Sequence, residues 1–84
     1  MQLDPRHVAK VTRLIEQASS ILLQASNCND SNQRRELLEQ AFYAYTDILP
    51  YLTHLPHLKQ PILQQIKNIE RLLEKEIERI ANNS

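Results

Sequence analysis

The stretch ILQQIKNIERLLEKEIERI, residues 62–80, decides the fold. Its apolar side chains return every three or four residues, which places them in one stripe along a helix. The stripe consists of Ile62, Ile66, Ile69, Leu73, the adjacent pair Glu76 and Ile77, and Ile80, with Leu63 and Leu72 beside it. Most charged side chains fall on the opposite face. A helix with one apolar stripe buries that stripe against other helices, so the rest of the chain has to supply them.

Two more stripes with the same spacing precede this one. The first lies on a helix over residues 5–26, where Asp4 caps the first turn and Pro5 fits the first helical position. Its members are Val8, Val11, Ile15, Ala18, Leu22 and Ala25. The second lies on a helix over residues 31–54, and its members are Leu38, Ala41, Tyr45, Ile48, Leu52 and Leu55.

The ends of these helices follow from side chains that disfavour or interrupt a helix. The chain has no glycine, so the first helix is expected to end through a left-handed Asn27 or Asn29, the residues next best suited to that conformation. Asp30 and Gln33 have the spacing of a capping box, which predicts that the second helix starts at Asp30 or Ser31.

Prolines mark the later boundaries. Pro50 interrupts the second stripe, which favours a kinked helix over one that ends near Leu49 and is followed by a short turn to His54. Residues 55–61 are expected to form a connection, in which either Pro56 or Pro61 opens the third helix.

The fold prediction is therefore all-α, an antiparallel up-down-up three-helix bundle. The helices are expected at about 5–26, 31–54 and 57–81, because short connections between long helices favour antiparallel neighbours. A chain of 84 residues has the size of one small domain, so residues 1–84 are assigned to a single three-helix unit.

The composition excludes several classes of function. Without glycine the chain has no glycine-dependent phosphate loop, and one cysteine builds neither a disulfide framework nor a multi-cysteine zinc site. Ten basic and ten acidic residues balance, so we expect no nucleic-acid partner. No apolar run is long enough to cross a bilayer, and residues 1–5 do not resemble a signal peptide. We therefore expect a cytoplasmic protein.

The aromatic residues of the chain gather in one ten-residue segment. They are Phe42, Tyr43, Tyr45 and Tyr51. On a continuous helix Tyr43, Asp47, Tyr51 and His54 share a second face. Exposed tyrosines are enriched at binding hot spots, which makes this face a candidate contact surface. The alternative is an ordinary mixed surface beside the kink.

Charge is distributed unevenly along the chain. Residues 17–29 carry no charged side chain, and residues 41–57 carry only Asp47. The centres of protein interfaces are depleted in charge, so these segments favour contact with another protein or with a second copy of the chain. The alternative is that their uncharged polar side chains suffice to solvate them. The third helix instead offers three possible ion pairs, Lys67 with Glu70, Arg71 with Glu74 and Lys75 with Glu78, on a solvated face.

Chemistry at a metal or a nucleophile has little support in the sequence. His54 and His57 have a spacing that suits a shared metal, with Asp47 as a conceivable third ligand, but Pro56 interrupts them and ordinary loop histidines explain them as well. Cys28 has no identifiable base nearby in the sequence. We expect no enzyme activity, no metal and no cofactor.

The segment EQAFYAYTDILPYL, residues 39–52, resembles the middle helix of microtubule interacting and trafficking (MIT) domains. Glu39, Ala41 and Tyr45 reproduce the family's Glu-x-Ala-x-x-x-Tyr pattern, and Ile69 and Arg71 fit its third-helix signature. In that signature Asn68 and Leu73 stand where the family has tyrosine and glutamate.

The resemblance implies a module that captures short helical or extended peptide motifs in a groove between two helices. The groove-lining role then falls near Tyr43, Asp47, Lys67, Arg71 and Glu74. The implied partners are tails of ESCRT-III-type membrane-remodelling proteins, through which the protein would be recruited to endosomal membranes.

A second hypothesis is a self-associating helical structural or regulatory protein. The regular stripe of residues 62–80 is long enough to pair with its symmetry mate and give a six-helix dimer. A measurement of mass in solution distinguishes this hypothesis from the peptide-binding module.

Overall fold

The computed structural model describes residues 4–82, and the chain is all-helical in this range. Three α-helices follow one another, α1 (Pro5–Ser26), α2 (Ser31–Ile48) and α3 (Pro56–Asn82), with a 3₁₀ turn, η1 (Leu49–Leu52), directly after α2. No strand occurs among the described residues. Residues 1–3, to which the expectation of no signal peptide applies, and residues 83–84 lie outside this range.

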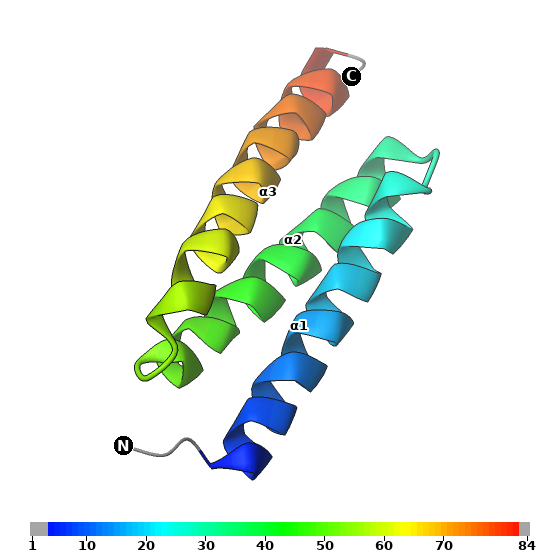
Figure 1. The fold of residues 1–84 in the computed structure, drawn as a ribbon. Coiled ribbons are helices and arrows are strands. Elements are labelled where there is room, and N and C mark those ends of the chain that lie inside the picture. Colours follow the sequence, from blue (N-terminus) through cyan, green and yellow to red (C-terminus); the bar gives the residue numbers. More distant parts are fainter. Residues whose placement is uncertain (1–3, 83–84) are drawn as a thin grey trace.

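The helix α2 occupies the central position of the fold. In Figure 1, α1 and α3 flank α2, and both pack against it. No Cα atom of α1 comes within 8 Å of a Cα atom of α3 in the described helices. The residues of α2 therefore supply the centre of the core, while α1 and α3 each leave surface that no other helix covers.

The buried apolar core is drawn from the three predicted stripes, although Val8 of the first and Ile77 of the third are exposed. Its apolar members are Val11, Ala18, Ala25, Leu38, Ala41, Tyr45, Ile48, Leu52, Leu55, Ile62, Ile66 and Ile69. Every residue of the second stripe is among them, as expected for the helix between two neighbours. Ala18 and Ala41 are fully buried, and their small side chains allow the backbones of α1 and α2 to approach closely.

Both ends of α1 lie where the sequence predicts, at Pro5 and Ser26, but the conformation of its C-terminal cap differs. Asp4 accepts a hydrogen bond at 3.0 Å from the backbone N–H of Arg6, and Pro5 is the first helical residue. Asn27 ends α1 with φ −92° and ψ −1°, and no described residue has a positive φ, so the left-handed cap was a wrong prediction. The guanidinium of Arg34 instead donates to the carbonyl of Cys28, which satisfies a backbone acceptor just after the helix end.

The second helix is shorter than the predicted 31–54, and it does not continue through a kink. It starts at Ser31, where Asp30 accepts at 3.3 Å from the N–H of Asn32 rather than that of Gln33. It ends at Ile48, because Pro50 has no N–H to donate to the carbonyl of Thr46. The N–H of Leu49 donates to the carbonyl of Thr46 instead, and the chain continues as the 3₁₀ turn η1.

The third helix begins at Pro56, one of the two prolines predicted to open it. Pro56 opens α3, one residue before the predicted 57, and only residues 53–55 connect it to η1. The predicted connection over 55–61 is therefore wrong, and Pro61 lies inside the second turn of α3. A proline is tolerated so near a helix start because only the carbonyl of His57 loses a partner to it.

Candidate peptide-binding groove

A groove runs between α2 and α3 and has a volume of about 400 Å³. We call it the α2–α3 groove, and the residues that line it are Glu39, Phe42, Tyr43, Glu70, Leu73, Glu74 and Ile77. It forms because the two helices pack through their buried stripes and leave the next row of side chains on each helix partly open. Four of the seven side chains are apolar or aromatic, and the other three are carboxylates.

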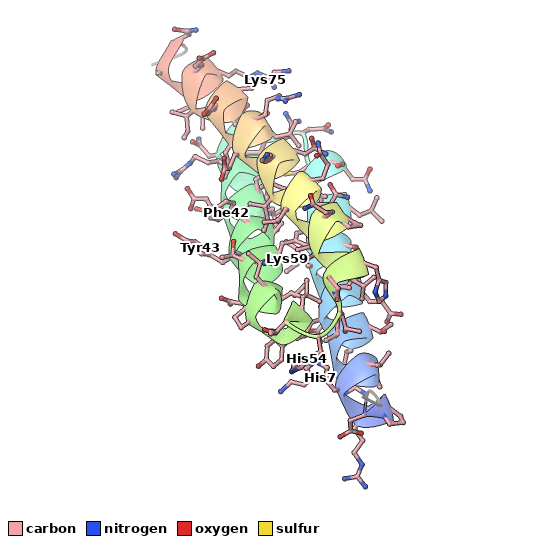
Figure 2. All side chains as sticks on the ribbon, turned by 60° about the vertical axis from the view of Figure 1, so that its left-hand side comes forward. His7, Phe42, Tyr43, His54, Lys59 and Lys75 are labelled. Atoms are coloured by element: carbon pink, nitrogen blue, oxygen red, sulfur yellow. The ribbon has the colours of Figure 1, made fainter. Side chains whose placement is uncertain are left out.

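The apolar side chains form the floor and one wall of the groove. Phe42 and Leu73 are half-buried against the core, whereas Tyr43 is 64% and Ile77 is 52% exposed. The rings of Phe42 and Tyr43 meet edge to face, with centroids 5.7 Å apart, and Figure 2 shows Tyr43 projecting away from α2. Covering Tyr43 and Ile77 with a partner is favourable, because it removes large apolar side chains from water.

The rim of the groove is acidic. Glu39 is bound to Arg35 at 3.1 Å, but both side chains are about two-fifths exposed. Glu70 and Glu74 have no ion-pair partner within 4.0 Å among residues 4–82, and neither does Glu78. The three ion pairs predicted on the outer face of α3 are therefore absent, which leaves the carboxylates of Glu70 and Glu74 free beside the apolar floor.

Two of the seven candidate residues from the sequence, Tyr43 and Glu74, line this groove together. Asp47, Lys67 and Arg71 are exposed on α2 and α3 but do not line it. The binding role of all these residues stays a prediction.

Tyr51 lies elsewhere, against α1. Its carbonyl is 2.7 Å from Nε2 of His7, its ring lies 6.1 Å from the His7 ring, and the ammonium of Lys10 sits 4.8 Å from its centroid. The face predicted to join Tyr43 with Tyr51 assumed a continuous α-helix. The 3₁₀ turn at η1 advances about 120° per residue instead of 100°, and this rotates Tyr51 toward α1.

The two histidines considered for a metal site are exposed. His54 lies in the turn after η1, and Figure 2 shows it near His7 at one end of the molecule. His57 lies in the first turn of α3. No group of three or more His, Cys, Asp or Glu side chains within residues 4–82 is arranged to hold a metal ion.

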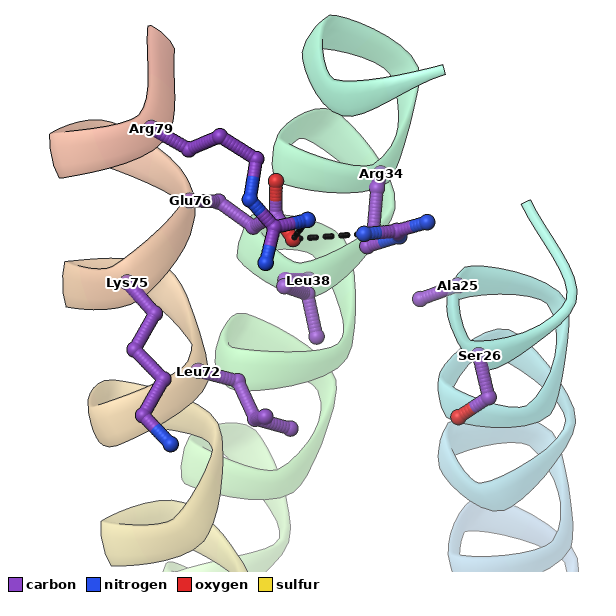
Figure 3. A pocket seen from close by; sticks show the side chains of 8 residues that line it. All are labelled: Ala25, Ser26, Arg34, Leu38, Leu72, Lys75, Glu76 and Arg79. Atoms are coloured by element: carbon purple, nitrogen blue, oxygen red, sulfur yellow. Dashed lines mark hydrogen bonds and ion pairs between the residues drawn. The ribbon is translucent and has the colours of Figure 1, made fainter. Parts of the chain in front are cut away.

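A second hollow, of about 470 Å³, lies at the other end of the molecule among all three helices (Figure 3). At its centre lies Glu76, whose side chain is 6% exposed and whose carboxylate accepts from Arg34 at 2.7 Å and from Arg79 at 3.2 Å. The hydrogen bond from Arg34 lowers the pKa of the Glu76 carboxyl below its usual 4.5; burial opposes this shift, and the charges of Arg34 and Arg79 support it.

This cluster has a structural role that the sequence did not reveal. Arg34 joins the α1–α2 connection, through the carbonyl of Cys28, to α3, through Glu76. The stripe of α3 admitted either Glu76 or Ile77 at this position, and the structure buries the glutamate. Arg34, 42 residues earlier in the chain, and Arg79, three residues later on the same helix, supply the cations that make this burial possible.

The apolar stripe proposed for symmetric dimer formation is used inside the chain. Ile62, Ile66 and Ile69 are buried against α2, so they offer no surface to a second copy. The exposed large apolar residues in the described part of α3 are Leu72 and Ile77, on either side of that stripe.

Comparison of the chain with protein-family models, with curated proteins and with solved structures finds no match. No helix in residues 4–82 has both the length and the apolar character that crossing a membrane requires.

Proposed function

We propose that this protein is an MIT-like interaction module that binds short helical or extended peptide motifs in the α2–α3 groove. The observation that carries the proposal is the combination of exposed Tyr43 and Ile77 with the unpaired carboxylates of Glu70 and Glu74. An amphipathic peptide helix has both features needed to match it, an apolar stripe for the floor and cations beside the stripe for the rim.

An antiparallel up-down-up order of α1, α2 and α3 is part of the proposal. Two contacts support it. His7, near the start of α1, meets Tyr51, just after α2, and Arg34, near the start of α2, meets Glu76, near the end of α3. With this order a peptide in the α2–α3 groove becomes a fourth helix of the bundle.

Affinity for one peptide is expected to be modest. The groove is shallow and open, and its carboxylates are exposed to water, where each ion pair contributes less than about 1 kcal/mol. Modules of this kind gain strength when several of them engage several motifs at once. We propose ESCRT-III-type tails as partners, with the protein in the cytoplasm and recruited to endosomal membranes through them, and we assign no catalytic role.

A binding assay with matched variants tests the proposal. A fluorescently labelled amphipathic tail peptide with basic flanks is titrated with the wild-type chain, with Tyr43→Ala and with Leu23→Ala. Leu23 is 63% exposed, almost equal to Tyr43 at 64%, but it lies on α1 away from the groove. Tyr43→Ala should weaken binding by about tenfold, the loss expected for a hot-spot side chain, and Leu23→Ala should leave it unchanged. Equal effects of the two variants would contradict the proposal.

A further inference from the structure

A basic stripe on α1 has the opposite charge to the α2–α3 groove. A shallow hollow on the outer surface of α1 is lined by α1 residues alone, which are Arg6, Ala9, Lys10, Arg13, Leu14 and Gln17. We call this set the α1 stripe. It carries three cations, and Glu16, the only acidic residue of α1, does not line it. No described residue of α2 or α3 lines this hollow, and Lys10 alone of the set contacts Tyr51 of η1.

The cations of the α1 stripe form no ion pair with an acidic side chain in the part of the chain that the structure describes. Within residues 4–82 no carboxylate oxygen lies within 4.0 Å of a side-chain nitrogen of Arg6, Lys10 or Arg13; the Asp4 carboxylate meets only the backbone N–H of Arg6. Lys10 rests over the ring of Tyr51, and this contact leaves its charge uncompensated. The α2–α3 groove is the reverse case, because Glu70 and Glu74 form no ion pair with a cation among residues 4–82.

We infer that the α1 stripe of one copy docks in the α2–α3 groove of a second copy. The inference rests on the proposed function, because it uses the same groove. Arg6 and Lys10 are four residues apart, as are Glu70 and Glu74, so both pairs are spaced about 6 Å along their helices and face each other in register.

The apolar parts of the two surfaces also match. Between its cations the α1 stripe presents Ala9, which permits close approach, and half-buried Leu14, which meets the apolar floor at Phe42 and Ile77. The contact joins two different surfaces and is therefore heterologous. It competes with peptide binding, so a peptide partner has to displace a neighbouring copy.

Sedimentation equilibrium tests the inference. The wild-type chain should exceed its monomer mass of 9.8 kDa as concentration rises at low salt, and should return to it at about 0.5 M salt, where exposed charges are screened. Two double variants, Arg6→Gln/Lys10→Gln and Glu70→Gln/Glu74→Gln, should each stay monomeric with unchanged helical circular dichroism.

An equimolar mixture of the two variants is decisive. The first keeps an intact groove and the second keeps an intact α1 stripe, so the mixture should form a one-to-one complex of about twice the monomer mass. Any one of three results would overturn the inference. The wild-type chain could stay monomeric at low salt, a variant could associate like the wild type, or the mixture could stay monomeric. A monomer that still binds the tail peptide leaves the proposed function standing, whereas association without peptide binding overturns only the proposed function.

Discussion

The guanidinium Nη1 of Arg34 lies 2.7 Å from Oε1 of Glu76, and this ion pair links the start of α2 to the last turns of α3. The two side chains are 23% and 6% exposed, so this pair is less accessible to water than Arg35–Glu39, whose side chains are 38% and 43% exposed. A carboxylate this deeply buried costs much free energy to desolvate, and the protein depends on Arg34 and Arg79 to offset that cost.

Loss of Arg34 should therefore destabilise the fold strongly. Arg34→Met leaves Glu76 with Arg79 alone, and we expect the free energy of unfolding to fall by about 3 kcal/mol. The control is Arg35→Met, which removes the adjacent but exposed pair with Glu39 and should cost less than about 1 kcal/mol. Urea titration followed by circular dichroism measures both values. Equal losses would show that Glu76 is not a buried charge.

Stability should also depend on pH through Glu76. The pKa of this carboxyl is lowered in the folded chain relative to its usual 4.5, so the folded state favours the charged form. The resulting stabilisation is complete above pH 4.5 and is lost as the pH falls through the lower, folded pKa. Urea unfolding at a series of pH values should show this loss in the wild type and a smaller one in Glu76→Gln. An identical profile for the two chains would contradict the assignment.

The hydroxyl of Tyr45 should contribute to stability, and that of Tyr43 should not. Tyr45 is 2% exposed, and its hydroxyl lies 2.9 Å from Oγ of Ser19, which joins α2 to α1. Tyr45→Phe removes this hydrogen bond and should lower the free energy of unfolding by about 1 kcal/mol. Tyr43→Phe is the matched control, since Tyr43 is exposed in the groove. The same urea titration compares them, and equal stabilities would argue against the Ser19 contact.

Much of the core was predictable because it depends on spacing within each helix. Tyr45 and Ile69 were placed in the core by three-four periodicity alone, and both are buried. The sequence did not decide whether Glu76 or Ile77 is buried, because the burial of Glu76 depends on Arg34, which only the tertiary fold brings near. The rotation of Tyr51 was missed for a local reason, since Pro50 ends α2 and η1 changes the number of residues per turn.

The groove was predictable only in part. Tyr43 was recognised as an exposed aromatic, and Glu74 came from the resemblance to MIT domains. Glu70 was instead assigned to an ion pair with Lys67 that does not form. Phe42 and Ile77 belong to the groove because of how α2 and α3 are rotated against each other, and periodicity within one helix does not specify that rotation.

Amide chemical-shift mapping tests the central claim most directly. The ¹⁵N-labelled Arg6→Gln/Lys10→Gln variant, which keeps the α2–α3 groove but lacks two cations of the α1 stripe, is titrated at low salt with an ESCRT-III-type tail peptide. The account predicts that shifts concentrate at residues 39–43 of α2 and 70–77 of α3, while α1 stays unchanged. Shifts centred on α1 or η1, or no shifts with any such tail, would contradict it.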